Sequence, residues 1–180
     1  MAVIYRKCEV EDAYQFKNVE ALTFYDTYKD ILPKDFLENK VNSINSELSF
    51  TNRFLENNGS YNYVACDGNK IVGILSFNIF NKCGHIDSLY VLPEYQGNGI
   101  GKSLFRIAVS FFIENNISKM DLYCLGGSKA IDFYKKYCGY ISGLRTFSSD
   151  GIGRFHEIII NFKNMNDTLA KLDENKFIRK

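Results

Sequence analysis

The residues best suited to chemistry form one glycine-rich segment, Gln96-Gly97-Asn98-Gly99-Ile100-Gly101-Lys102-Ser103. Glycine has no Cβ, so the backbone here can turn sharply and approach a ligand closely. An apolar strand pattern precedes the segment and an amphipathic helical pattern follows it. The first turn of a helix has unpaired N–H groups and the positive end of a dipole, which suit a phosphate. Lys102 and Ser103 add a cation and a hydroxyl, so the segment predicts an anion-binding turn.

Two familiar phosphate-binding motifs do not fit this turn. A P-loop ends in Gly-Lys-Ser or Gly-Lys-Thr, as Gly101-Lys102-Ser103 does, but its first glycine would fall at Gln96. A dinucleotide fingerprint requires Gly-x-Gly-x-x-Gly, whereas Lys102 occupies the last of those positions here. Neither a magnesium-nucleotide site nor a dinucleotide site is therefore expected.

The elements that must position the turn follow from apolar periodicity. Segments rich in Val, Ile, Tyr and Phe predict strands at residues 3–6, 61–66, 71–80, 85–91, 119–125, 140–147 and 154–162. Helical spacing of apolar residues predicts helices at residues 11–29, 35–37, 44–55, 100–115 and 128–137. This order, an antiparallel meander followed by a β-α-β-α-β-β section, predicts an α/β (α+β) fold. Its single mixed, mostly antiparallel central sheet is flanked by helices.

Size and composition limit the class of protein. The 180 residues suit one domain, expected over residues 1–165, with a polar C-terminal tail at 166–180. The chain has 22 Lys+Arg against 21 Asp+Glu, so no nucleic-acid partner is expected. No run approaches the roughly 20 apolar residues that span a bilayer, so no membrane partner is expected. The five cysteines have no metal-ligand or redox spacing, which predicts reduced thiols, no metal site and a cytoplasmic protein.

Two motifs resemble a known family. The segment 89–101 closely resembles the coenzyme A-binding signature of the GNAT N-acetyltransferase superfamily, a strand followed by a Gln/Arg-x-x-Gly-x-Gly/Ala turn and a helix. The segment 130–140 is similar to the family's Ala-x-x-Phe-Tyr…Gly-Phe segment, and residues 27–33 look like its acceptor-side helices. The resemblance implies a GNAT-like acyl-CoA N-acyltransferase fold, with acetyl-CoA as the cosubstrate.

The resemblance also implies the cofactor contacts. The glycine turn would bind the pyrophosphate, and the strand end at Leu89, Tyr90 and Val91 would leave its neighbour and pair with the pantetheine arm. An N–H near Tyr90 or Val91 would polarise the thioester carbonyl. Many members have an Asn where this chain has Gly127, so either Ser128 or backbone groups take over that contact. The remaining cofactor-binding residues implied are Gln96, Gly97, Asn98, Gly99, Ile100, Gly101, Lys102, Ser103 and Tyr134.

Tyr134 matches the family tyrosine that lies near the thioester sulfur. A phenol with a pKa of about 10 can protonate a departing thiolate whose acid has a pKa of about 8.5. Asp87 and His85 lie two residues apart in a strand, so their side chains share a face that leads to the thioester. Asp87, His85 or an ordered water is the expected general base, and His156 and Glu157 are further candidates.

The sequence therefore predicts an N-acetyltransferase. It would transfer the acetyl group to a primary amine of a small molecule or a peptide by direct attack in a ternary complex. Gly127 keeps open a second hypothesis, a non-catalytic acyl-CoA-binding sensor or regulatory module. The acceptor cleft is expected within the first 60 residues, and the resemblance is compatible with a homodimer. The residues expected to line that cleft are Phe24, Tyr25, Tyr28, Ile31 and Leu32.

Overall fold

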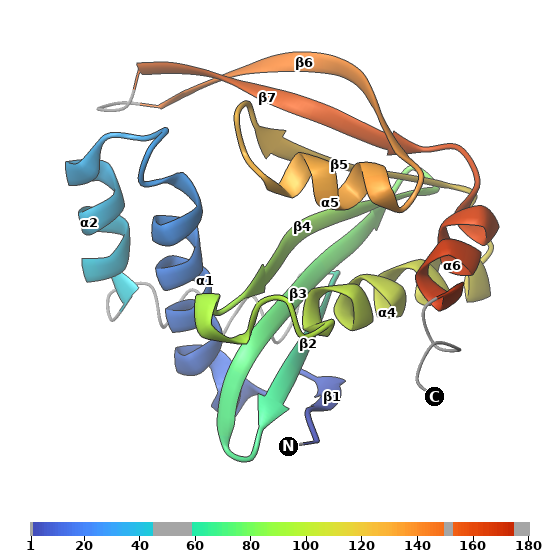
Figure 1. Ribbon diagram of the computed structural model, residues 1–180, viewed down its shortest axis with the longest axis horizontal. Coiled ribbons are helices and arrows are strands. Elements are labelled where there is room, and N and C mark those ends of the chain that lie inside the picture. The colour runs from blue at the N-terminus through green and yellow to red at the C-terminus, as the bar shows by residue number, and fades with distance from the viewer. Residues whose placement is uncertain (1, 45–58, 150–152, 175–180) are drawn as a thin grey trace.

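One seven-stranded sheet, in the order β1-β2-β3-β4-β5-β7-β6, forms the centre of the protein in a computed structural model that describes residues 2–44, 59–149 and 153–174 (Figure 1). The strands are β1 (Ile4–Lys7), β2 (Ser60–Asp67), β3 (Lys70–Phe80), β4 (Cys83–Val91), β5 (Lys119–Leu125), β6 (Gly139–Ser149) and β7 (Gly153–Phe162). The helices are α1 (Ala13–Tyr28), α2 (Lys34–Asn42), α4 (Ile100–Glu114), α5 (Ala130–Lys136) and α6 (Met165–Asp173), with short 3₁₀ turns η1 (Val10–Asp12) and η2 (Pro93–Tyr95).

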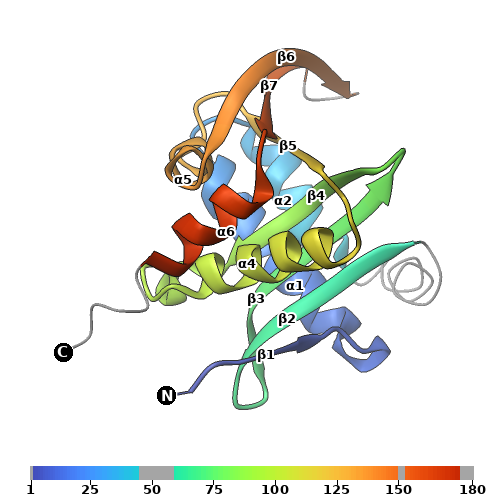
Figure 2. The same cartoon turned by 90° about the vertical axis from the view of Figure 1, so that its right-hand side faces the viewer.

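The sheet is mixed and mostly antiparallel, which confirms the predicted fold class. Strands β1 to β4 form an antiparallel meander, β4 and β5 are parallel, and β7 pairs antiparallel with both β5 and β6. Helices α4, α5 and α6 lie on one face and α1 and α2 on the other (Figure 2). The helix predicted at 44–55 lies outside the described residues apart from Ile44.

Helix α4 packs closely on the sheet because two strand residues opposite it are glycines. A Cβ on Gly84 would lie 2.5 Å from the ring of Phe112, which is fully buried. A Cβ on Gly73 would lie 3.1 Å from both Ile100 and Leu104 at the start of the helix. A Cβ on Gly84 has no room in this packed core, and one on Gly73 would require its neighbours to shift, so the two glycines let α4 lie close to the sheet.

Strand β4 is irregular at Asp87. Ser76 of β3 pairs with Ser88 and Phe77 pairs with Ile86, so Asp87 is the additional residue of a β-bulge. The parallel ladder between β4 and β5 also ends here, at Ile86 and Leu122. Beyond this point the two strands diverge, and the end of β4 turns away from β5 (Figure 1).

The polar segment predicted from residue 166 includes most of α6, the helix Met165–Asp173. Asn164 caps its first turn by accepting hydrogen bonds from the N–H groups of Asn166 and Asp167. Met165 and Leu172 join the main core, and Asp173 forms an ion pair with Arg106 of α4 at 2.8 Å. The helix was missed because its apolar residues are few within a polar segment.

Candidate active site

The glycine turn lies at the surface and opens directly into α4. Gly97 and Gly99 have φ of +77° and +81°, and a Cβ on either would meet no atom within 4 Å. The first helical N–H to bond within the helix belongs to Ser103, which donates to Gly99 at 3.0 Å. The N–H groups of Ile100, Gly101 and Lys102 precede that bond and have no intrahelical carbonyl to reach. The turn therefore presents open space and backbone donors to a ligand.

Two side chains hold the turn against the end of β4. The Gln96 amide donates to the Val91 carbonyl at 2.9 Å, which joins the turn to the last strand residue. The Asn98 amide donates to the carbonyls of Tyr95 and Gln96 at 3.3 and 3.2 Å. Both side chains thus stabilise the turn itself, while Lys102 and Ser103 lie half-buried on the first turn of α4.

The opening between β4 and β5 begins at Asp87 and reaches Val91. The register gives Leu89, Tyr90 and Val91 partners on β3 and none on β5. Backbone polar groups on that side of β4 therefore lack the ladder that a complete sheet would supply. An extended chain that carries amides could pair there as an added strand.

Three phenols from three elements meet at this opening. Burial raises the pKa of Tyr134 on α5 and of Tyr90 on β4 well above 10.0, and raises the pKa of Tyr28 on α1 to about 12. Tyr28 and Tyr90 are close enough to affect each other's pKa, and Tyr28 also contributes to the raised pKa of Tyr134. Since α1 and α5 lie on opposite faces of the sheet, the opening connects the two faces.

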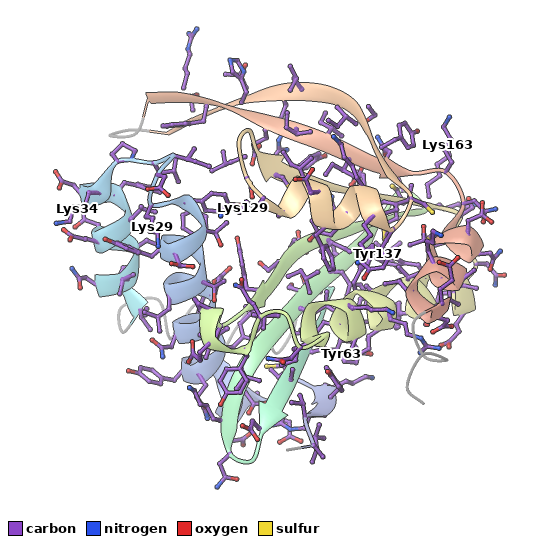
Figure 3. The ribbon with its side chains drawn as sticks, in the orientation of Figure 1. Lys29, Lys34, Tyr63, Lys129, Tyr137 and Lys163 are labelled. Carbon is purple, nitrogen blue, oxygen red and sulfur yellow. The ribbon has the colours of Figure 1, made fainter. Side chains whose placement is uncertain are left out.

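Tyr134 is a core residue as well as a site candidate. Its ring packs edge-on against Phe105 of α4 with centroids 5.5 Å apart, and the residue is 6% exposed. Burial, followed by the nearby thiol of Cys124, raises its pKa, so the phenol keeps its proton at neutral pH. Tyr137, at the end of the same helix, also points towards α4 (Figure 3) and has its ring 6.2 Å from Phe105.

His85 and Asp87 lie together as predicted. His85 Nε2 is 3.9 Å from Asp87 Oδ1, and the Asn78 amide donates to both Asp87 oxygens at 3.0 and 2.9 Å. Burial raises the pKa of the Asp87 carboxyl above 3.8, while His85 and Asn78 act to lower it. The reasoning from strict strand alternation was incomplete, because Asp87 is itself the additional residue of the bulge.

Asp121 is the residue of this group that the sequence analysis missed. It lies opposite His85 in the parallel register, and its Oδ1 is hydrogen-bonded to His85 Nδ1. One signal was present in the sequence, an acidic residue within the otherwise apolar stretch Met120-Asp121-Leu122 of a predicted strand. Its partner depended on a register that the sequence alone did not define.

The other predicted residues are placed as follows. Ser128 is buried, its hydroxyl accepts from the Ala130 N–H at 3.2 Å, and it lies close enough to Tyr28 to affect the pKa of that phenol. Gly127 has φ of +86°, a left-handed turn that favours glycine. His156 is exposed, whereas Glu157 pairs with Arg145.

The residues expected to line an acceptor cleft belong to one small apolar cluster, in which Phe24, Tyr25 and Ile31 are partly buried. The cluster joins α1 and α2 to the end of β5 and to β7, and it contains Phe24, Tyr25, Tyr28, Ile31, Leu32, Phe36, Leu37, Leu125 and Phe155. A separate hollow of about 470 Å³ between α1 and η2 contains none of the predicted site residues.

Neither a membrane helix nor a metal centre is present in the part of the chain that the structure describes. No helix of residues 2–44, 59–149 and 153–174 is long and apolar enough to cross a membrane. In the same ranges no group of three His, Cys, Asp or Glu side chains could hold a metal ion. All five cysteines are free thiols.

Residues 21–140 match the acetyltransferase (GNAT) family, and the chain belongs to it. The uncharacterized N-acetyltransferase YuaI of Bacillus subtilis is 26% identical over 141 residues, which cover 75% of this chain and 79% of that protein. Family membership supports acetyl transfer as the chemistry of the site.

Solved structures show the same fold. The PaiA N-acetyltransferase of Thermoplasma acidophilum, crystallised with coenzyme A, aligns with a TM-score of 0.71 at 23% identity over 91% of this chain and 99% of that one. A chimera of the spermidine N-acetyltransferase SpeG of Vibrio cholerae and hSSAT aligns with a TM-score of 0.70 at 17% identity, over 94% and 99%. At these identities the likeness establishes the fold.

The buried phenols predict a loss of stability at high pH. Folded-state pKa values above the unfolded value of about 10 mean that the folded protein keeps protons that the unfolded chain releases. The contribution of these phenols to the free energy of unfolding is therefore fully present below about pH 10 and falls above it. For Tyr28, raised from 10.0 to about 12, the fall continues to about pH 12 at roughly 1.4 kcal/mol per pH unit. The Cys124 thiol, raised by burial from 9.0 to about 12, adds to it from pH 9.

Urea unfolding at a series of pH values between about 8 and 11 measures this slope, and tyrosine absorbance reports phenolate formation. Tyr28→Phe should flatten the slope because one buried phenol is gone. A free energy of unfolding that stays constant above pH 10 would contradict the prediction.

Proposed function

We propose that the protein is an acetyl-CoA-dependent N-acetyltransferase that transfers the acetyl group to a primary amine in a ternary complex. The observation that carries the proposal is the opening between β4 and β5, which leads from an exposed turn of backbone donors to a group of buried phenols. The exposed turn suits a pyrophosphate, the opening beside β4 suits an amide-bearing arm, and the buried phenols suit a thioester.

The geometry supports the following binding roles. The N–H groups of the turn and the Lys102 cation would receive the pyrophosphate. The side of β4 that lacks a strand partner, from Leu89 to Val91, would pair with the pantetheine amides. An N–H of that segment would also donate to the thioester carbonyl, whose oxygen becomes negative during attack. The sequence-predicted contacts of Gln96 and Asn98 would then be made by backbone, since their side chains brace the turn.

The reaction needs one base and one acid. The attacking nitrogen forms a C–N bond with the thioester carbon and gives up a proton, with His85 and Asp87 as the groups that take it. The C–S bond breaks, and the thiolate receives the phenol proton of Tyr134. Burial keeps that phenol protonated but also makes the transfer uphill, so we propose that the proton moves together with C–S cleavage.

The acceptor would approach from the α1 side of the sheet, where His85, Asp87 and Asp121 are partly exposed. Three side chains that accept hydrogen bonds suit a primary amine that arrives as ammonium. Small-molecule and peptide amines both satisfy this chemistry. The free cysteines support a reducing compartment, the cytoplasm, for the enzyme.

Gly99→Ala should weaken coenzyme A binding by about tenfold or more. The left-handed φ strains alanine by about 1–2 kcal/mol, and relief of that strain rotates the N–H groups of the turn. Gly68→Ala is the matched control, because Gly68 has φ of +59° and equally open space in the β2–β3 hairpin. Both variants should lose similar stability, and calorimetric titration with coenzyme A should separate them. Equal affinities would contradict the role of the turn.

Thiol release from acetyl-CoA should exceed the hydrolysis rate with at least one amine of a panel. The panel consists of a polyamine, an aminoglycoside, an amino acid and a peptide with a free N-terminus. Since the second hypothesis is a sensor, coenzyme A binding is measured alongside. Binding without thiol release for any amine would exclude the transferase and favour a sensor.

Tyr134→Phe should lower kcat by roughly 100-fold or more and leave the Kd for coenzyme A unchanged, because only the proton donor is removed. Tyr137→Phe is the control, since Tyr137 is buried and also contacts Phe105 but belongs to the core. The thiol-release assay measures both. Similar rates for the two variants would reject Tyr134 as the acid.

A further inference from the structure

His85 lies between two carboxylates, and it forms a hydrogen bond with only one of them. On one side Nδ1 is hydrogen-bonded to Asp121 of β5. On the other side Nε2 lies 3.9 Å from Asp87 Oδ1, too far for a hydrogen bond. The parallel register places His85 and Asp121 directly opposite each other, so the backbone fixes the first contact.

The bond to Asp121 decides which nitrogen carries the proton. A carboxylate only accepts, so the neutral imidazole must present Nδ1–H to it. Nε2 then has a free lone pair. This is the tautomer required of a ring that takes a proton from a third group at Nε2.

Asp87 cannot close the remaining distance, because the Asn78 amide holds both of its oxygens and the bulge fixes its backbone. Two acceptors, Nε2 of His85 and Oδ1 of Asp87, therefore face each other across 3.9 Å. A single nitrogen with two N–H groups, about 2.8 Å from each acceptor, fits that distance.

We propose that Asp121 is a positioning residue, which fixes the Nδ1–H tautomer of His85 so that Nε2 and Asp87 together receive the acceptor nitrogen. The inference rests on the proposed transferase function. An ammonium R–NH₃⁺ gives one proton to Nε2, and the resulting R–NH₂ attacks the thioester. After the attack the nitrogen loses its second proton to Asp87, which passes it to solvent, while the thiolate takes the proton of Tyr134. Solvent restores the proton of Tyr134, and His85 returns its proton to solvent. One proton is released in each cycle.

Other groups near His85 do not replace Asp121. The Cys83 thiol lies 3.9 Å from Asp121 Oδ2, and desolvation raises its pKa. The ring of Tyr123 lies 4.7 Å from that of His85 and is covered by the Arg145 guanidinium at 3.6 Å. Arg145 is itself paired with Glu157 of β7.

Lys119 precedes Asp121 on β5 and acts on Cys83. Asp121 and Asp87 are thus the anions that the structure places against the ring of His85.

Nitrogen-15 NMR of the histidine rings tests the tautomer directly in the whole protein. The chain has two histidines, so His156→Gln leaves one ring to observe. The expected spectrum at mildly alkaline pH shows a protonated Nδ1 and an unprotonated Nε2. In an Asp121→Asn variant the ring should lose its uniform Nδ1–H form, because a side-chain amide can either donate to Nδ1 or accept from it. An Nε2–H ring before substitution would overturn the proposal.

Kinetics test the role in catalysis. Asp121→Asn should lower kcat for the acceptor found in the amine panel by roughly tenfold or more and leave the Kd for coenzyme A unchanged. Asp173→Asn is the matched control, since it removes a carboxylate that pairs with Arg106 on the opposite face. Asp173→Asn should retain both kcat and the histidine spectrum. An unchanged kcat in Asp121→Asn would overturn the proposal.

A double substitution separates positioning from support of the fold. If Asp121 acts through His85, Asp121→Asn should add little to the loss already caused by His85→Gln. Independent, additive losses would assign Asp121 a structural role and overturn the inference. A protein that releases no thiol with any amine would instead reject the transferase function, and the histidine spectrum would still decide whether Asp121 fixes the tautomer.

Discussion

The end of the β4–β5 ladder at Ile86 and Leu122 is the constraint on which the rest of the site depends. Within a sheet each strand satisfies the backbone of its neighbour, and buried groups without such partners are costly. The last residues of β4, next to the bulge at Asp87, lack such a partner strand on the β5 side. The unpaired edge is useful because an extended, amide-bearing ligand can supply the missing bonds.

The core on one side of the sheet keeps the strands apart. Phe105 of α4 is fully buried and touches the rings of Phe133, Tyr134 and Tyr137, so α4 and α5 are joined across the opening by aromatic packing. Helix α4 is in turn seated against Gly84 through Phe112. The exposed turn at its start is therefore attached to the closely packed core. This attachment favours ligand binding, because the N–H groups of the turn are already in place when a ligand arrives.

Local sequence was sufficient for much of this arrangement. The strands and most helices follow from apolar periodicity, and the turn follows from glycines whose left-handed φ the structure shows at Gly97 and Gly99. The bulge at Asp87 could not be derived, since it arises from the pairing of β3 with β4 and no local residue pattern requires it. Asp121 was missed for a similar reason. Its proposed role depends on its position opposite His85. That position is set by the register between two strands, and the two residues are 36 positions apart in the sequence.

The site residues on the two faces of the sheet differ in their exposure to water, and this difference separates the proton donor from the proton acceptors. The phenols at the opening are buried, and burial keeps their protons on. The side chains of His85, Asp87 and Asp121 are 23%, 35% and 24% exposed, so water can reach the group that accepts a proton. Two environments that differ in hydration hold a donor on one side and acceptors on the other. Tyr28 and Tyr134 come from opposite faces and interact through the opening, so a thioester held there would lie between the two. A nitrogen entering from the hydrated side would therefore lose its proton towards water, while the sulfur would leave towards the side that keeps its protons.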